Sequence, residues 1–415
     1  MGKFNKILYG ILLAIITIML GLVNQHGCET QQLIGLSTPT ITITPDSGYN
    51  NTDTNWSASW SATDYSYNYS FWDKNTTTER VLLAYSFGAN FSGTTIVNHG
   101  SWGTNGTVYG TMGTSHLYWI NNATFGEGTG YFQFGASTHY INSTRRDNIT
   151  RPFTTCVSVL VNSFPSTGGN VGLFSKWDST LNKRSWMIYV STNSTGSYIK
   201  GGTSSTGSSI YSAISSVLSS TADWFDVCLV ATSDPSNLLY INGLLNASTT
   251  PSSSTIYATN QPIIIGMFMA NGSASNYFNG TTSNVVLYNW SLSASQIAER
   301  YDALLDRRSQ KLVADETEVG DNWTLNVIIS NGTSYSTTKQ NQGIGDVTAT
   351  TPATLYVNIS HPDCDDSHTR LEASSLDTPW CSLDAPLTND KMLSGDTLYI
   401  CKGEYKEYPH LTSYR

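Results

Sequence analysis

The chain has 415 residues and a formal net charge of −9, and only 12% of its residues are charged. This acidic balance argues against a nucleic-acid partner, because nucleic-acid-binding proteins present a basic surface to the phosphates. Low charge combined with abundant Ser, Thr, Asn, Gly and Tyr is typical of β-sandwiches with many turns, so the composition predicts an all-β fold. The length allows about two to four domains.

Residues 1–27 have the pattern of a targeting segment. Lys3 and Lys6 precede an apolar run from Ile7 to Val23. That run is slightly long for a signal-peptide core and near the lower limit for a membrane-spanning helix. A cleaved signal peptide, which we favour, and an uncleaved anchor both stay open. Since no later stretch could span a bilayer, we expect a secreted or cell-surface protein attached to a membrane, if at all, through this segment.

Many N-x-S/T sequons follow the targeting segment. In a secreted chain, such sequons are candidate glycosylation sites on surface loops. A chain rich in Asn, Ser and Thr also forms them by chance, so the pattern predicts sites without showing their use. The candidates include Asn55, Asn105, Asn193, Asn289 and Asn331.

Residues 39–80 alternate polar and apolar side chains in short runs. Trp56, Ala58 and Trp60 recur with period two, as do the aromatic residues from Tyr65 to Phe71. This is the pattern of half-buried strands. Three strands fit here, too few for a stable sandwich, so further strands must come from elsewhere in the chain.

Residues 81–306 contain a series of strand motifs in which Asn242-Gly243 has the signature of a hairpin turn. The series comprises Val81–Phe87 (VLLAYSF), Gly130–Ile141 (GYFQFGASTHYI), Phe153–Val161, Leu173–Lys176, Trp186–Val190, Trp224–Ala231 (WFDVCLVA), Leu239–Leu245 (LYINGLL) and Ile263–Gly266.

The series ends with a turn, a strand and a short helix. Asn279-Gly280 is the expected turn, and Val285–Tyr288 is apolar on both faces, which predicts a strand buried on both sides. Ser293 and Gln296 have the spacing of a capping box. An apolar helical stripe follows, formed by Ile297, Tyr301, Leu304 and Leu305.

The order of these motifs resembles that of laminin-G-like jelly rolls in the concanavalin A-like lectin/glucanase superfamily. Thr282 and Gln296 depart from the family pattern, which has Ile and an acid there. The resemblance covers just over half of the chain and implies an antiparallel two-sheet jelly-roll sandwich over residues 81–306, with a short C-terminal helix. In the closing segment, the match rests on Phe278, Gly280, Val285, Leu287, Tyr288, Asn289, Leu292, Ser293 and Ile297.

Cys156 and Cys228 lie inside two of these strands. Pentraxins, which share this sandwich, join the equivalent strands by a disulfide, in contexts similar to Phe153–Cys156 (FTTC) and Trp224–Cys228 (WFDVC). The resemblance therefore implies a Cys156–Cys228 bond, which a secreted location would permit. Two buried free thiols are the alternative.

A further group of strands is expected at residues 312–345. Trp323, Leu325, Val327 and Ile329 alternate as a strand, and Asn331-Gly332 closes a hairpin. Together with residues 39–80, this stretch resembles a smaller immunoglobulin-like domain into which the jelly roll is inserted. The alternative is two separate β extensions that pack on the jelly roll.

Residues 353–415 change in character. Gly395–Tyr405 (GDTLYICKGEY) resembles the first coil of a pectate-lyase-like parallel β-helix. Such a helix stacks many coils to build its core, so we expect this β segment to be C-terminally incomplete. Of Cys364, Cys381 and Cys401, the pair that we predict to form a disulfide is Cys381–Cys401.

The sequence offers no clear catalytic site. The glucanases of this superfamily use paired carboxylates, and no matching spacing occurs in the jelly roll; nor do the seven His residues form a zinc motif. We therefore predict a protein that is not an enzyme and has no cofactor. Calcium bound by Asp178 and backbone carbonyls is a weak alternative, because calcium needs about six to eight oxygen ligands.

Sugar binding requires exposed aromatic side chains beside amides, because an aromatic face packs on a pyranose and amides recognise its hydroxyl groups. The candidate glycan-binding residues are Trp177, Asp178, Asn182, Asn276 and Tyr277. The alternative for Trp177 is a structural role as a cap on the sandwich.

Three functions stay open. The first is a non-catalytic, extracellular carbohydrate-binding or adhesion protein whose partners are glycans or components of the cell surface and extracellular matrix. The second is an accessory region of a polysaccharide-degrading enzyme with a catalytic β-helix outside this sequence. The third is a structural cell-surface protein without a ligand, since a fold alone does not give a function.

Overall fold

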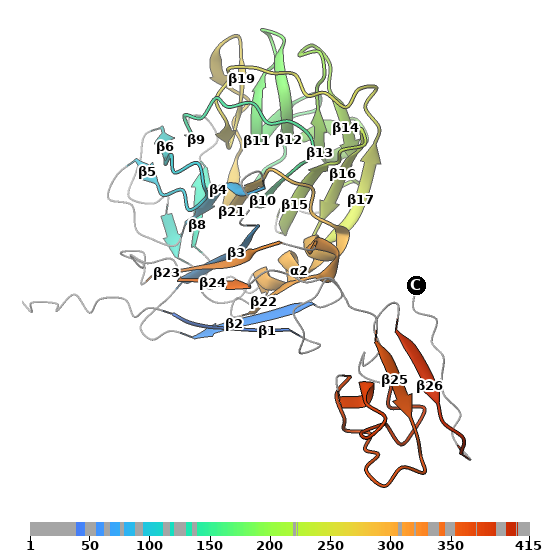
Figure 1. Cartoon of the computed structure of the whole chain (residues 1–415). Coiled ribbons are helices and arrows are strands. Elements are labelled where there is room, and N and C mark those ends of the chain that lie inside the picture. Colours follow the sequence, from blue (N-terminus) through green and yellow to red (C-terminus); the bar gives the residue numbers. More distant parts are fainter. Residues whose placement is uncertain are drawn as a thin grey trace, which may run out of the picture.

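The computed structural model shows a mainly β protein (Figure 1). The structure describes residues 39–45, 55–61, 67–74, 79–87, 94–110, 117–119, 130–134, 139–218, 221, 223–305, 309–318, 321–330, 340–344, 353–370, 372–386, 396–403 and 405. The predicted targeting segment at residues 1–27 and the sequon at Asn331 lie outside these ranges. Among the described helices, none is long and apolar enough to cross a membrane.

Two large antiparallel sheets form the jelly-roll sandwich that the resemblance implies. In the part of the chain that the structure describes, one sheet has eight strands. Its order is β17 (Leu244–Thr249), β16 (Asn237–Ile241), β15 (Trp224–Ala231), β10 (Phe153–Val161), β21 (Gly280–Tyr288), β8 (Gly130–Phe134) and β7 (Leu117–Trp119), with β4 (Val81–Ser86) also paired to β21.

The facing sheet has ten described strands, and its neighbours are antiparallel except for one parallel bridge between β11 and β19. Its order is β14 (Tyr211–Ile214), β13 (Gly196–Thr203), β12 (Lys183–Asn193), β11 (Asn170–Asp178), β18 (Ile264–Ile265), β9 (Tyr140–Asn142), β6 (Gly106–Tyr109) and β5 (Thr95–Ile96), with β19 (Phe268–Ala270) and β20 (Ser273–Ser275) paired beside β11.

Strand β21 explains why the middle of the protein has two cores. Val285 and Leu287 point into the apolar core between the two large sheets, whereas Val286 and Tyr288 point into a second core on the other side. Successive side chains of a strand point to opposite faces, so an uninterrupted apolar run buries both faces. The prediction that this strand is buried on both sides is confirmed.

The second core lies between the eight-stranded sheet and a pair of small sheets, here called the outer unit. Strands before the jelly roll pair in the outer unit with strands after it, as an inserted jelly roll requires. The immunoglobulin-like classification and the domain boundaries stay predictions. The two small sheets are β1 (Thr40–Pro45), β2 (Trp56–Ser61) and β22 (Ser309–Leu312), and β24 (Gln340–Ile344), β23 (Trp323–Ser330) and β3 (Tyr67–Lys74).

Helix α2 (Ala294–Leu305) packs beside β22 and the outer unit. The Ser293 hydroxyl accepts the Gln296 backbone N–H at 3.1 Å, which is one half of the predicted capping box. The reciprocal half is wrong. The Gln296 side chain bonds Lys311 and Val313 instead, and the Ser293 N–H is satisfied by the carboxylate of Glu316, which lies in the short 3₁₀ helix η1 (Ala314–Glu316).

The predicted apolar stripe of α2 is only partly correct. Ile297 is fully buried, but Leu305 is 42% exposed. The buried face includes Arg300, whose guanidinium forms an ion pair with the buried carboxylate of Asp226. The ion pair with Asp226 therefore lets Arg300 be buried in α2, at a position that a pattern of apolar residues does not predict.

Cys156 and Cys228 form a disulfide between directly opposed residues of β10 and β15. Both residues belong to the second core, so the bond lies between the jelly roll and the outer unit. The Arg300 guanidinium nitrogen is 3.6 Å from the Cys228 sulfur. The disulfide therefore joins two neighbouring strands of the eight-stranded sheet, and the Asp226–Arg300 ion pair joins this sheet to helix α2.

The described residues from 353 to 405 form a separate lobe (Figure 1). It contains a parallel pair, β25 (Thr354–Val357) and β26 (Thr397–Ile400), and the short 3₁₀ helix η2 (Glu372–Ser374). Its disulfide is Cys364–Cys381, so the predicted Cys381–Cys401 pair is wrong. The Asp365 N–H donates to the Pro379 carbonyl and brings the two cysteine loops together, whereas Cys401 continues the ladder beyond β26. The β-helix stays a prediction.

Candidate functional site

Among the described residues, the outer unit packs on the eight-stranded sheet and not on the outer face of the ten-stranded sheet. The outer unit lies against the eight-stranded sheet, on the other side of the sandwich (Figure 1). Along β12, Trp186, Ile188 and Val190 point into the main core, so the alternating residues Met187 and Tyr189 point outward. The period of two along a strand therefore places an apolar and an aromatic side chain on this face.

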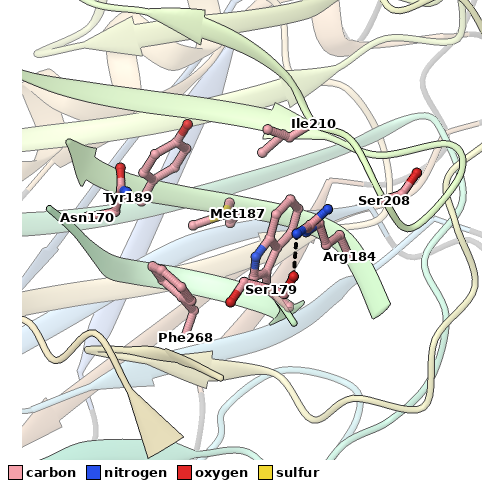
Figure 2. A pocket seen from close by; sticks show the side chains of 9 residues that line it. Asn170, Ser179, Arg184, Met187, Tyr189, Ser208, Ile210 and Phe268 are labelled. Carbon is pink, nitrogen blue, oxygen red and sulfur yellow. Dashed lines mark hydrogen bonds between the residues drawn. The ribbon is translucent and has the colours of Figure 1, made fainter. Parts of the chain in front are cut away.

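A pocket of about 230 Å³ opens on this outer face (Figure 2). Met187, Tyr189 and Phe268 give it an apolar and aromatic surface, while polar side chains stand around it. None of the lining residues is acidic. The lining comprises Asn170, Trp177, Ser179, Arg184, Met187, Tyr189, Ser208, Ile210 and Phe268.

Trp177 is both packed and part of the pocket lining, so its roles in glycan binding and as a structural cap stay predictions. It is only 6% exposed because it packs in a cluster with Met187 and Phe268. It also lines the pocket, and the Arg184 guanidinium lies over its ring at 5.6 Å from the centroid. Such cation–π contacts hold an arginine in a defined place, so Trp177 fixes Arg184 at the pocket wall.

Asp178 supports the pocket instead of facing a ligand. Its side chain is fully buried, and its carboxylate accepts four backbone N–H groups. The donors are Thr180 and Leu181 from the loop after β11, at 3.1 and 3.2 Å, and Asn271 and Gly272 from the β19–β20 turn, at 3.1 and 2.7 Å. This carboxylate joins two segments that carry pocket residues, Ser179 and Phe268.

Asn182 and Asn276 do not line the pocket. Both have a positive φ, of 51° in each case, and Asn182 is exposed in the loop between β11 and β12. Asn276 uses its backbone carbonyl to accept the Gly172 N–H at 3.1 Å, and its side chain donates to Ser275. These amides shape loops, which is a common role for Asn in the left-handed region.

Tyr277 belongs to a second aromatic group, here called the tyrosine strip, which consists of Tyr109, Tyr140 and Tyr277. The Tyr109 and Tyr140 rings stack with centroids 4.8 Å apart, and Tyr277 lies 6.3 Å from Tyr140. Their neighbours Val108 and Ile141 point into the main core, so Tyr109 and Tyr140 lie on the outer face. Burial, followed by the neighbouring tyrosines, raises the pKa of Tyr140.

Sequence reasoning missed most of the pocket. Arg184, Met187, Tyr189, Ile210 and Phe268 were not among the candidates, although the alternation along β12 contains the signal for two of them. Tyr189 donates to or accepts from Ser212 at 3.3 Å, and burial raises its pKa. Its hydroxyl therefore stays protonated near neutral pH and can act as a neutral hydrogen-bond group.

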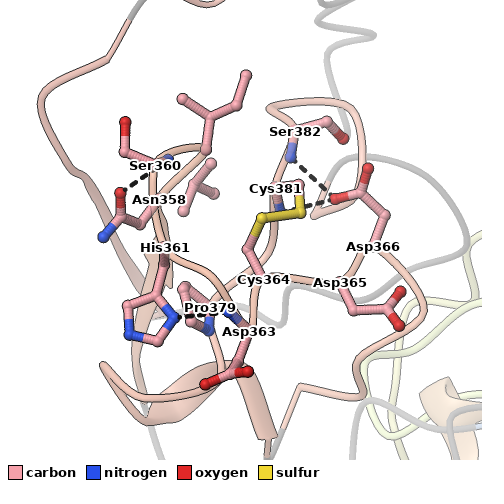
Figure 3. The surroundings of a disulfide bond; sticks show 12 residues. Asn358, Ser360, His361, Asp363, Cys364, Asp365, Asp366, Pro379, Cys381 and Ser382 are labelled. Carbon is pink, nitrogen blue, oxygen red and sulfur yellow. Dashed lines mark hydrogen bonds between the residues drawn. A yellow bond between two sulfur atoms is a disulfide. The ribbon is translucent and has the colours of Figure 1, made fainter.

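In the part of the chain that the structure describes, no group of three or more His, Cys, Asp or Glu side chains could hold a metal ion. Figure 3 shows the acidic loop around Cys364–Cys381. Asp366 accepts the N–H groups of Cys381 and Ser382, both at 2.8 Å, so its carboxylate closes the disulfide loop.

The described sequons differ in their surroundings. Asn55, Asn105 and Asn193 are exposed, whereas Asn289 is half-buried and accepts the Arg80 N–H. The Asn193 side chain caps the turn between β12 and β13 by accepting the N–H groups of Thr195 and Gly196. Glycosylation stays a prediction for all of them.

Comparison with known proteins gives one family match. Residues 127–298 match the family described as the concanavalin A-like lectin/glucanases superfamily. No curated protein matches the chain.

Many solved structures are similar to the chain, including the following three. The crystal structure of HCR/D-Sa-GBL1/C is 15% identical with a TM-score of 0.41 and matches 54% of this chain and 52% of its own. The binding domain of botulinum neurotoxin DC in complex with SialylT is 14% identical with a TM-score of 0.40, covering 55% and 52%. The present chain thus spans about half the length of both.

The third is domain 4 of AbnA, a GH43 extracellular arabinanase from Geobacillus stearothermophilus, in complex with arabinotriose. It is 15% identical with a TM-score of 0.37, and the match covers 53% of this chain and 98% of that one.

Proposed function

We propose that this chain, whose residues 127–298 belong to the concanavalin A-like lectin/glucanase superfamily, is an extracellular, non-catalytic glycan-binding protein. The pocket on the outer face of the ten-stranded sheet would hold one sugar ring. The observation that carries the proposal is the combination of an aromatic and apolar lining with a few polar groups on the outer face of the ten-stranded sheet. This is the usual composition of a site for a small organic ligand.

The size of the pocket fits a small ligand. Its volume of about 230 Å³ lies below the range of about 300–1,000 Å³ that is usual for drug-sized ligands. A single sugar ring is therefore a better match than a longer ligand buried along its whole length. A polysaccharide would insert one residue and leave the rest of the chain on the outer face.

The lining supplies both kinds of contact that a sugar requires. The side chains of Met187, Tyr189 and Phe268 can pack on the C–H groups of the ring. Asn170 and Ser208 offer an amide and a hydroxyl that can pair with sugar hydroxyl groups. A ligand that does not pair with these polar groups would leave them without hydrogen bonds, which costs free energy. The contacts would therefore also provide specificity.

Two features support an extracellular, non-enzymatic role. The disulfides Cys156–Cys228 and Cys364–Cys381 are typical of proteins from oxidising compartments. The pocket lining contains no carboxylate, whereas glycoside hydrolysis generally uses two. A role as accessory region of a polysaccharide-degrading enzyme would use the same pocket and stays a prediction.

The test is a glycan array probed with the wild-type chain and two variants, with and without calcium. Ser208→Trp introduces an indole at an exposed position that lines the pocket, and Ser209→Trp introduces it at the exposed neighbour that does not. We expect wild type and Ser209→Trp to bind the same glycans and Ser208→Trp to lose them. Absence of binding by the wild type to every glycan, or equal binding by both variants, would refute the proposal.

A further inference from the structure

We propose that the pocket selects sugars that carry a carboxylate, such as uronic acids or sialic acids, and that the Arg184 guanidinium recognises that group. This inference rests on the proposed function and adds the class of glycan. It comes from the hydrogen bonds of Arg184 and from the charges around the pocket.

Arg184 is held in place but is not saturated by the protein. Its backbone N–H donates to the Gly207 carbonyl at 3.3 Å, its guanidinium lies over the Trp177 ring, and one guanidinium nitrogen donates to the Ser179 carbonyl. A guanidinium has five N–H donors in a planar fork. Within the described residues, Arg184 thus keeps most of its donors for a ligand at the pocket wall.

Arg151 shows what a purely structural arginine looks like in the same sandwich. It makes four hydrogen bonds that join neighbouring strands and loops, to acceptors on Thr232, Ser236, Thr203 and Asn237. Arg184 makes one described side-chain hydrogen bond and lines a pocket. The contrast favours a ligand role for Arg184, because most of its planar N–H donors have no described protein acceptor and can donate to a carboxylate.

The charges near the pocket favour an anionic ligand. No acidic residue lines it, and the Lys200 ammonium lies 6.0 Å from the ring centroid of Tyr189, another lining residue. The acid adjacent in sequence, Asp178, is buried and already accepts four N–H groups. A chain with a net charge of −9 therefore presents cations at this pocket, and a planar guanidinium suits the bidentate recognition of a carboxylate.

Isothermal titration with matched sugars tests the inference. The probes are tri-galacturonic acid and 3′-sialyllactose, which separate uronic from sialic acids, and lactose and galactotriose as neutral counterparts. The proteins are the wild type, Arg184→Gln, Arg184→Lys and the control Arg146→Gln, which removes an exposed arginine outside the pocket lining. Thermal unfolding of each variant reports whether it is folded.

We expect the wild type and Arg146→Gln to bind at least one acidic sugar about tenfold or more tightly than its neutral counterpart. Arg184→Gln should lose that preference, with a decrease in affinity of about 10- to 100-fold for the acidic sugar. Arg184→Lys, which keeps the charge without the planar fork, should lie between them.

Two results would overturn the inference, and they are distinguishable. Equal binding of neutral and acidic sugars, unchanged by Arg184→Gln, would refute acidic selectivity while glycan binding survives. Absence of binding to all four sugars by the folded wild type would refute this inference, and an empty glycan array would then refute the proposed function as well.

Discussion

Removing the carboxylate of Asp178 tests whether this residue is a support or a ligand contact. The fully buried side chain accepts four backbone N–H groups from two segments. Each neutral hydrogen bond contributes about 1 kcal/mol net, and bonds to charged groups contribute about 1.5–3 kcal/mol. Water can rehydrate part of the exposed loops, so Asp178→Ala should destabilise the protein by about 3–5 kcal/mol, and Asp178→Asn, which keeps one carbonyl oxygen, by about 1–3 kcal/mol.

Urea unfolding followed by tryptophan fluorescence measures these losses, and sugar titration well below the transition measures binding. We expect Asp178→Asn to keep its affinity within a few-fold while it loses stability, because the carboxylate positions Ser179 and Phe268 without touching the sugar. Calcium should leave the unfolding midpoint unchanged. If Asp178→Asn keeps wild-type stability but loses sugar binding, the ligand role suggested by the sequence is correct and the structural argument is wrong.

Three further predictions concern the sandwich and its outer face. Burial lowers the pKa of Lys176 to about 8 from its ordinary 10.5. Between these pH values the unfolded state binds more protons than the folded state, so the free energy of unfolding should rise with pH. Urea unfolding of the wild type and Lys176→Met across this range should show the rise only in the wild type. Replacing Cys156 and Cys228 together by Ala should cost about 4 kcal/mol, given their separation of 72 residues, and a loss below 1 kcal/mol in urea unfolding would contradict this. We also predict that the tyrosine strip extends the site for glycans longer than one ring, because its stacked rings lie on the same outer face as the pocket. Tyr140→Ala should therefore weaken binding of oligosaccharides by about three- to tenfold without affecting monosaccharides, and an equal loss for both in titrations would contradict this prediction.

The parts of the fold that the sequence predicts are those that depend on local patterns. Val285–Tyr288 is apolar on both faces, which predicts a strand buried on both sides. Asn242-Gly243 forms the turn between β16 and β17, with positive φ at both residues. Asn279-Gly280 is a wrong turn prediction, because Gly280 begins β21 and pairs with Phe134. The turn lies at Asn271-Gly272, where both φ values are positive and β19 pairs with β20.

The candidate site is predictable only in part because its determinants come from distant segments. Trp177 is a candidate by its residue type and lines the pocket, and its role in glycan binding stays a prediction. Asp178 looks like a ligand in sequence, and only the arrival of the Asn271 and Gly272 N–H groups shows that its oxygens are occupied. Arg184 is recognised as a candidate only when its one described side-chain hydrogen bond is compared with the four of Arg151, and this comparison requires coordinates.

A crystal structure of the protein with the glycan that binds most tightly on the array tests the central claim most directly. The account predicts one sugar ring between Met187, Tyr189 and Phe268, with its polar groups toward Asn170, Ser208 and Arg184. Sugar density at any other surface, with this pocket filled only by water, would contradict it.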